Sequence, residues 1–328
     1  IKIGKDLELR GALPSSFMSL APGSHDPGVW HDINRMLTLN GSQTQKGLQN
    51  HVCLARGSLV LTRRGFVPIQ DVKVGDLVLT HEGRWKAVQV VANTGARPVV
   101  DFRAQGVAAL ALTPEHKVWA RKSNWARSRD GAERANPEWV RADEMVGGYV
   151  NLKLPPVEDS TLTNQECWIL GRWLADGHRG VRGDFYVSVG PDKLAEFERM
   201  AGEHAGTRAV RTAVQFRLKA LHHEMIEALN RCGSGAGEKQ VPAELLSLNA
   251  EKARALLDGY LSGDGHFVSD RGTWMATSIS RALLLGMAIL AQRVHGTVAS
   301  LRAGRKAGTK TIDGREVKTR QEWVLSFD

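Results

Sequence analysis

The pattern of apolar and polar residues changes twice along the chain. Residues 1–52 are rich in Gly, Ser, Pro, Asn and Gln, with one short candidate helix at residues 30–37. Such a segment cannot build a hydrophobic core alone. From residue 53 onward, strand-length apolar runs are separated by Gly, Asp and Asn, which predicts strands and turns. We therefore expect an all-β module over residues 53–154, with strands near residues 58–61, 65–69, 76–79 and 87–91.

The last region, residues 155–328, mixes two periodicities. Apolar residues recur at helical spacing in several segments, and strand-like runs lie between them. The predicted helices cover residues 165–175, 193–201, 221–229, 250–261 and 281–294, and the predicted strands cover residues 185–189 and 214–218. This mixture predicts an α+β domain.

The α+β region repeats internally. Residues 170–177 and 258–265 align without gaps, and both end a helical segment with Asp-Gly. Each copy also carries two small residues one helical turn apart, which puts them on the same helical face. These small residues are Gly171, Ala175, Gly259 and Gly263. We expect two helices that touch along these faces, which makes the domain pseudo-symmetric.

The repeat places Asp176 and Asp264 at the same end of the predicted helix contact. Two adjacent carboxylates can hold Mg²⁺, which takes one or two protein carboxylates and fills its shell with water and phosphate oxygens. A metal there stabilises the attacking and leaving oxygens of phosphodiester hydrolysis. The alternative is that Asp-Gly only ends each helix, because Gly is common after a helix. A matched pair favours the metal site over two independent stop signals.

The repeated motif resembles the LAGLIDADG homing endonucleases, over residues 155–328. The resemblance implies two halves that meet along the two helices and cut double-stranded DNA with metal held at Asp176 and Asp264. It further implies a catalytic role for Lys239, because residues 238–242 resemble the family's Lys-x-x-Pro block. A solvated loop lysine is the alternative for Lys239. One chain carries both halves, so we expect a monomer.

The C-terminal segment is strongly basic, and the whole chain has a formal net charge of +9. Basic strands and hairpins lie along the DNA groove in the family that the repeat resembles, so the resemblance implies DNA contacts here. The candidate residues are Arg302, Arg305, Lys306, Lys310, Lys318 and Arg320. An ordinary solvated basic hairpin is the alternative. Lys306, Lys310 and Lys318 are also unranked candidates for a second catalytic lysine.

Cys53 begins the β-rich region, and Thr113 and His116 follow later in it. A thiol that attacks the carbonyl of Val52 converts the amide into a thioester, which requires a twisted amide and a proton for the leaving nitrogen. His116 suits proton donation because the pKa of histidine lies near neutrality. Thr113 can hydrogen-bond the same amide. A buried structural cysteine and a chance Thr-x-x-His are the alternatives.

Residues 53–79 and 113–116 together resemble the first two sequence blocks of the Hint fold, which inteins share with hedgehog autoprocessing domains. The resemblance implies a thioester at Cys53, with Thr113 and His116 as catalytic residues. Larger inteins carry an endonuclease after the second block, so the two resemblances support one another. Inteins end in His-Asn followed by Cys, Ser or Thr, and residues 300–328 contain no such pair. We therefore expect incomplete splicing in a truncated reading frame, with a split intein as the less favoured explanation.

Residues 1–52 precede the expected splice junction and are interpreted as host sequence, the N-extein. Within them, residues 24–36 and 43–52 resemble part of a DNA adenine or cytosine-N4 methyltransferase, with any other intein host as the alternative. Three widely spaced cysteines without a C-x-x-C pair indicate a reducing, cytoplasmic setting. No apolar stretch approaches the length needed to span a bilayer.

The sequence therefore predicts a Hint self-splicing module followed by a metal-dependent homing endonuclease. Mg²⁺ is the expected cofactor, and double-stranded DNA and the host exteins are the expected partners. Two alternatives stay open. One is a LAGLIDADG-fold protein that binds DNA without cutting it, and the other is a Hint autoprocessing domain that is not an intein.

Overall fold

The structure, a computed structural model, forms two compact units, Ile1–Pro155 and Pro156–Asp328. It describes residues 2–3, 53–93, 95–104, 107–121, 137–145, 149–150, 153–210, 214–312 and 315–328. The candidate helix at residues 30–37 and nearly all of the expected host segment lie outside these residues. None of the helices in the described ranges is long and apolar enough to cross a membrane. Each unit is described by itself below.

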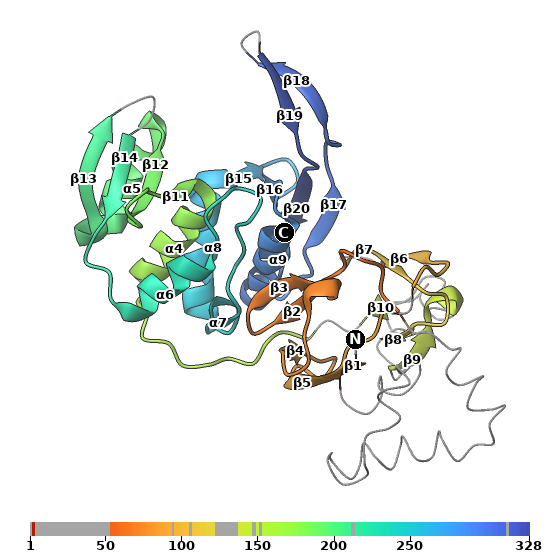
Figure 1. The fold of residues 1–328 in the computed structure, drawn as a ribbon. Helices are drawn as coiled ribbons and strands as arrows, with labels where there is room; N and C mark the ends of the chain where they lie inside the picture. The colour runs from red at the N-terminus through yellow and green to blue at the C-terminus, as the bar shows by residue number, and fades with distance from the viewer. Residues whose placement is uncertain are drawn as a thin grey trace, which may run out of the picture. The chain divides into compact units, whose positions relative to one another are not determined.

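The first unit begins with a five-stranded antiparallel sheet of order β1-β5-β4-β2-β3 (Figure 1). Its strands are β1 (Lys2–Ile3), β2 (Leu59–Thr62), β3 (Gly65–Pro68), β4 (Leu77–Leu79) and β5 (Trp85–Val90). Alternating residues of these strands point inward, and four valines form the core: Val67, Val72, Val78 and Val88. The strands thus form close to where the apolar runs predict them.

Two smaller sheets complete the first unit. One is the hairpin of β6 (Val100–Ala104) and β7 (Val107–Leu112), and the other has the order β10-β8-β9. The latter contains β8 (Lys117–Arg121), β9 (Glu138–Arg141) and β10 (Tyr149–Val150). Two short 3₁₀ helices, η1 (Ile69–Asp71) and η2 (Ala142–Glu144), follow β3 and β9. Within its described residues the unit is therefore β-rich, but its strands are divided among several small sheets joined by 3₁₀ turns.

The second unit is built around two helices, α4 (Asn164–Asp176) and α8 (Ala250–Asp264), which lie side by side (Figure 1). A capping box begins α4, in which the Thr163 hydroxyl accepts from the Glu166 N–H and the Glu166 carboxylate accepts from the Thr163 N–H. Asn249 caps α8 by accepting from the Lys252 N–H. Both helices end at the aspartate of the repeated motif.

A four-stranded antiparallel sheet lies on each side of the helix pair (Figure 1). The first has the order β11-β12-β14-β13, from β11 (Gly177–Arg179), β12 (Phe185–Val189), β13 (Ala205–Val210) and β14 (Val214–Leu218). The second has the order β15-β16-β20-β17, from β15 (Gly265–Val268), β16 (Thr273–Ser278), β17 (Ser300–Ala303) and β20 (Trp323–Phe327). In each half the glycine of the motif starts a strand directly after the helix, so the two halves repeat one arrangement.

The remaining elements surround this framework. They are η3 (Pro191–Lys193), α5 (Leu194–Ala201), η4 (Gly202–His204), α6 (His223–Arg231), α7 (Ala243–Leu246), α9 (Arg281–His295) and the hairpin of β18 (Gly308–Ile312) with β19 (Arg315–Thr319). The five predicted helices and the two predicted strands all form. The short helix α7 was missed because four residues are too few to show a helical period.

Candidate functional site

The two helices of the second unit contact each other through glycine. A methyl group on Gly171 would overlap the Leu256 carbonyl oxygen and lie 2.8 Å from the Tyr260 nitrogen. A methyl group on Gly259 would overlap the Trp168 carbonyl oxygen and lie 2.8 Å from its carbonyl carbon. The backbones therefore approach too closely for any other residue at these positions. The close contact predicted from the repeated small residues is confirmed.

This contact brings the two motif aspartates to one end of the helix pair. A methyl group on Gly263, the residue before Asp264, would lie 2.9 Å from Oδ2 of Asp176. Desolvation, together with the nearby Asp176 carboxylate, raises the pKa of Asp264 to about 6. The effect of Asp176 on the pKa of Asp264 shows that the two carboxylates lie close together and concentrate negative charge at this end of the helix pair.

Arg172 neutralises part of this charge from within α4. Its side chain is only 2% exposed, and Nη1 lies 2.7 Å from Oδ2 of Asp176, a side chain that is 34% exposed. The contact is an ion pair without hydrogen-bond geometry, because Nη1 has no hydrogen-bond partner within the described chain. The guanidinium also lies against Gly263, where a side chain would displace it. A glycine at this position is therefore required for the ion pair as well as for the helix contact.

Two lysines approach the same place from outside the helix pair. The Lys193 Nζ donates to the Gly263 carbonyl at 2.6 Å. The Lys239 Nζ donates to the carbonyl oxygens of Trp173, at 3.1 Å, and Ala175, at 3.0 Å. Carbonyls at a helix C-terminus lack partners within the helix and carry partial negative charge, so both lysines stabilise helix ends.

Lys239 is not a solvated loop lysine, so that alternative is wrong. The residue is 5% exposed, and burial lowers the pKa of its ammonium, opposed by the nearby carboxylates of Asp264 and Asp176. The structure thus brings Lys239 together with both aspartates, as the resemblance implies. Its catalytic role stays a prediction.

The donor chemistry of this site fits a hard divalent cation. Among the residues that the structure describes, no group of three or more His, Cys, Asp and Glu side chains is arranged to hold a metal. Mg²⁺ needs fewer, because water and substrate phosphate oxygens complete its octahedral shell. Asp176 and Asp264 provide the carboxylate oxygens that it prefers. A cation would also relieve the repulsion that raises the pKa of Asp264.

Arg172 and Lys193 were not predicted as site residues. Arg172 could have been recognised from the sequence, because it is a charged residue inside a largely apolar helical segment. The second copy of the repeat has the uncharged Tyr260 at the same position. Lys193 carried no signal, because it reaches the site only through the tertiary fold. Two further polar groups of these helices, Tyr260 Oη and Trp173 Nε1, are buried and have no hydrogen-bond partner within the described residues.

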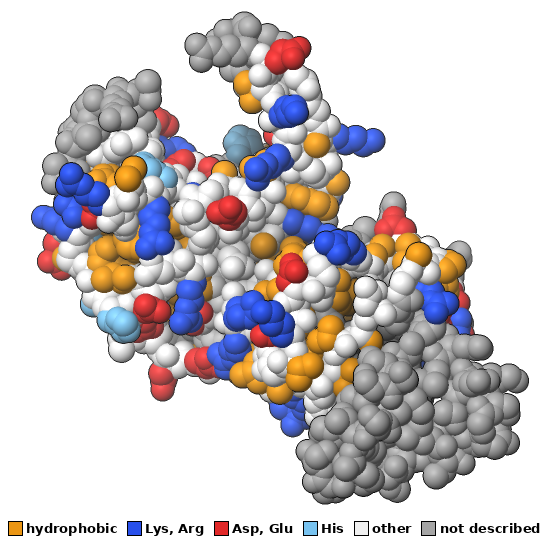
Figure 2. All heavy atoms as spheres, in the orientation of Figure 1, with side chains coloured by type: hydrophobic (Ala, Val, Ile, Leu, Met, Phe, Trp, Pro, Cys, Tyr) orange, Lys and Arg blue, Asp and Glu red, His pale blue; other side chains and the backbone are white. Residues whose placement is uncertain are grey.

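The basic C-terminal residues lie on and beside the β18–β19 hairpin. Figure 2 shows Lys and Arg side chains along it. Arg302 is in β17, Arg305 and Lys306 precede β18, Lys318 is in β19, and Arg320 follows it; all five are exposed, and Lys310 is in β18. Arg305 pairs with Glu322, with Nε and Oε2 3.7 Å apart. The predicted basic hairpin therefore exists, and DNA contact and a second catalytic lysine stay predictions.

In the first unit, Cys53 and Thr113 exchange two hydrogen bonds, one through the Thr113 hydroxyl and one between backbone groups. The Cys53 N–H donates to Thr113 Oγ1, and the Thr113 N–H donates to the Cys53 carbonyl, both at 3.0 Å. The adjoining bridge between Leu54 and Leu112 continues this pairing. The hydroxyl of Thr113 thus bonds the amide nitrogen that an acyl shift at Cys53 would release.

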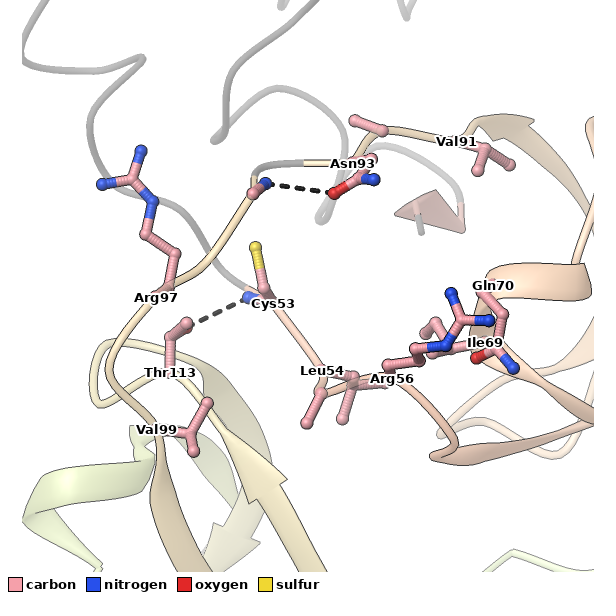
Figure 3. A pocket seen from close by; sticks show the side chains of 13 residues that line it. Cys53, Leu54, Arg56, Ile69, Gln70, Val91, Asn93, Arg97, Val99 and Thr113 are labelled. Carbon is pink, nitrogen blue, oxygen red and sulfur yellow. Dashed lines mark hydrogen bonds between the residues drawn. The ribbon is translucent and has the colours of Figure 1, made fainter.

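Cys53 also lines a pocket of about 470 Å³. The polar residues around it include Arg56, Gln70, Asn93, Arg97 and Thr113. Figure 3 shows the sulfur of Cys53 between two groups of residues, with Asn93 and Arg97 on one side and Arg56 and Gln70, which come from separate segments, on the other. The structure thus places the thiol where a second nucleophile can reach it.

His116 is half-buried near Cys53. Burial lowers its pKa to about 4, and interaction with the Cys53 backbone partly opposes this shift. At neutral pH the imidazole is therefore uncharged. As a proton donor it would supply a neutral N–H group, and its catalytic role stays a prediction.

This shift gives a pH dependence of stability. The unfolded chain binds a proton at His116 below about pH 6.5, whereas the folded chain does so only near pH 4. Stability of the first unit is therefore expected to be lost as the pH falls from about 6.5 to 4, by up to about 3 kcal/mol. Hydrogen exchange of peptides from residues 107–121 measures this loss. His116→Asn should flatten the profile, and an equally steep loss in that variant would contradict the assignment.

Both units match known domain families. Residues 52–153 match the family model of the Hint domain, and residues 251–327 match that of the LAGLIDADG-like domain. The two resemblances are confirmed at this level. The methyltransferase resemblance of residues 1–52 stays a prediction.

Curated relatives match long stretches of this chain within larger proteins. The chain is 25% identical over 279 residues to the ATP-dependent DNA helicase Hel308 of Thermococcus kodakarensis, covering 66% of this chain and 24% of the helicase. It is 25% identical over 350 residues to an iron-sulfur cluster assembly SufBD family protein of Mycobacterium tuberculosis, covering 92% of this chain and 40% of that protein. The chain therefore spans less than half the length of these relatives.

Similar solved structures include the N-terminal LAGLIDADG domain of DUF199/WhiA and I-DmoI in complex with DNA and Mn. The first is 9% identical, with a TM-score of 0.29, covering 51% of this chain and 78% of that one. The second is 12% identical, with a TM-score of 0.28, covering 50% of this chain and 88% of that one.

Proposed function

We propose that residues 156–328 form an endonuclease that cuts both strands of DNA with the help of Mg²⁺, within an intein. The observation that carries this proposal is the pair of aspartates held together by the glycine contact of α4 and α8. When bound, Mg²⁺ would stabilise negative charge on the phosphate and activate water. Asp176 and Asp264 would hold it, and Lys239 would remain beside both carboxylates as a fixed positive charge.

The relatives support an insertion element. A DNA helicase and an iron-sulfur cluster assembly protein have different functions, yet each aligns with most of this chain over a minor part of its own length. Such a distribution is expected for a segment that inserts into unrelated host genes. On this proposal residues 1–52 are host sequence, and their resemblance to a DNA methyltransferase is part of the same proposal.

The test is cleavage of a plasmid that carries the uninterrupted host gene. The purified chain is incubated with this plasmid and Mg²⁺, and a plasmid with the insertion site scrambled is the matched control. Linear product from the first plasmid alone supports the endonuclease. Specific binding without cutting would favour the alternative of an inactive LAGLIDADG-fold protein that only binds DNA.

A salt series adds a second criterion, because phosphate contacts from the β18–β19 hairpin would make DNA binding weaken steeply as the salt concentration rises.

We further propose that residues 53–155 form a thioester at Cys53. The hydrogen bond from the Cys53 N–H to Thr113 Oγ1 supports this proposal, because it acts on the amide nitrogen that leaves. In the shift the sulfur of Cys53 bonds to the carbonyl carbon of Val52, the carbon–nitrogen bond breaks, and the nitrogen takes up a proton. A thiol that enters the pocket could then release the N-terminal segment by exchange at the same carbon.

Thr113→Val is expected to slow this release about tenfold, because one hydrogen bond of about 1–1.5 kcal/mol is lost. Gel analysis of fragments released by dithiothreitol or hydroxylamine measures the rate. Cys53→Ala should abolish release. Thr80→Val is the matched control, because Thr80 bonds only within the turn before β5, at Arg84. Equal slowing by both threonine variants would argue against a role of Thr113 in the step.

A further inference from the structure

The two aspartates have different neighbours on their own helices. The repeat aligns Arg172 of α4 with Tyr260 of α8, each one turn before its aspartate. Both residues are fully buried. One therefore supplies a permanent positive charge, and the other supplies an uncharged phenol.

The two lysines of the site contribute positive charge near Asp264, but neither forms an ion pair with a carboxylate of the described chain. Lys193 and Lys239 direct their donors at backbone carbonyls of the helix ends rather than at a carboxylate. Arg172 alone is paired with a carboxylate, 2.7 Å from Oδ2 of Asp176. Asp264 lacks such a pair among the described residues. A guanidinium at this distance weakens the attraction of Asp176 for a second cation.

We propose that Arg172 makes the two carboxylates unequal, so that a divalent cation binds first on the Asp264 side and the two DNA strands are cut in a fixed order. The inference rests on the proposed endonuclease function. Arg172 is a positioning residue here, because it acts through Asp176 and not on the DNA. Because the ion pair at 2.7 Å acts on one carboxylate only, we expect a strand preference of about tenfold.

Strand-specific end labels on a duplex substrate give the first test. The native chain should accumulate a nicked intermediate that is always cut in the same strand. Arg172→Tyr gives both helices the same residue, and its two strand rates should converge to within about twofold. Arg172→Lys keeps the charge and should retain the order. Tyr260→Phe is the matched control, because it removes only an unbonded hydroxyl and should also retain it.

Metal binding gives a second test that does not depend on cutting. Terbium luminescence, excited through Trp173 and Tyr260, follows a titration of the full chain with Tb³⁺. The native chain should show one stronger and one weaker site, and Arg172→Tyr should tighten the weaker site about tenfold. Circular dichroism melting confirms that each variant is folded. Arg172→Met, which removes the charge and keeps an unbranched chain, replaces Arg172→Tyr in both tests if Arg172→Tyr does not fold.

The two tests separate failure of the inference from failure of the proposed function. Equal strand rates in a native chain that cuts DNA would overturn the inference and leave the endonuclease intact. If the native chain cuts no DNA, the Tb³⁺ titration still tests the inference. An unchanged Tb³⁺ affinity of the weaker site in Arg172→Tyr would show that Arg172 does not make the two carboxylates unequal. A strand order retained in a folded Arg172→Tyr would overturn the role of Arg172.

Discussion

Asp264→Asn is expected to reduce DNA cleavage at least about a thousandfold while DNA binding is retained, because a neutral amide cannot replace a charged ligand of the metal. The substitution keeps the size of the side chain. Asp264 lies at the end of the helix contact with an exposed side chain, and its pKa of about 6 leaves it charged under the slightly alkaline conditions of a cleavage assay. Plasmid cleavage and gel-shift binding measure the two properties separately.

The same variant is expected to be more stable than the native chain. The folded state holds the proton of Asp264 up to about pH 6, whereas the unfolded state loses it near pH 4. The ionised carboxylate therefore opposes folding at neutral pH, and this opposition disappears as the pH falls below about 6. Removing the charge should raise the Tm at pH 7.5 by an amount well below the roughly 3 kcal/mol that the full pKa difference represents, because solvent screens this exposed side chain.

Asp176→Asn is the matched comparison. It should also abolish cleavage, but it removes the carboxylate that is paired with the buried Arg172. A buried cation left without its partner is destabilising, so the Tm should fall. Opposite shifts in Tm with the same loss of cleavage would show that repulsion between the two carboxylates destabilises the native site. General damage to the fold would lower the Tm of both variants. Full cleavage by Asp264→Asn, or a lower Tm in that variant, would contradict the assignment.

The features that the sequence could predict are those encoded by local spacing. The repeated Asp-Gly and the small residues four apart define two helices, their contact face and the end at which the aspartates meet. The apolar runs of the first unit define its strands for the same reason. The positions of Cys53 and Thr113 in one backbone pairing followed from the Hint resemblance and not from spacing, because residues far apart in sequence meet there only through the sheet.

The electrostatics of the metal site could not be predicted in this way. Lys193 and Lys239 reach the helix ends from separate loops, so their positions depend on the tertiary fold. The desolvation that lowers the pKa of Lys239 and raises that of Asp264 is likewise a property of the packed structure. Arg172 is intermediate, because its place in the repeat is visible in the sequence but its ion pair depends on the space above Gly263.

Gly259→Ala is expected to destabilise the second unit by about 3–5 kcal/mol and to abolish cleavage with it. The added methyl group would meet three backbone atoms of Trp168, the oxygen, the carbonyl carbon at 2.8 Å and the Cα at 3.0 Å. A side chain can turn away from a new methyl group, but backbone atoms of a packed helix cannot, so α4 and α8 must separate. Urea unfolding followed by hydrogen exchange in α4 and α8 measures the cost.

Gly308→Ala is the control, because nothing lies within 4 Å of a methyl group at that position in β18. Its stability and cleavage should match the native chain. If Gly259→Ala stays as stable as Gly308→Ala but no longer cuts, the helices have moved without unfolding, and the aspartates require their close spacing for activity. If Gly259→Ala is both stable and active, the close contact of α4 and α8 does not position Asp176 and Asp264. That result would contradict the assignment of the catalytic site to these two residues.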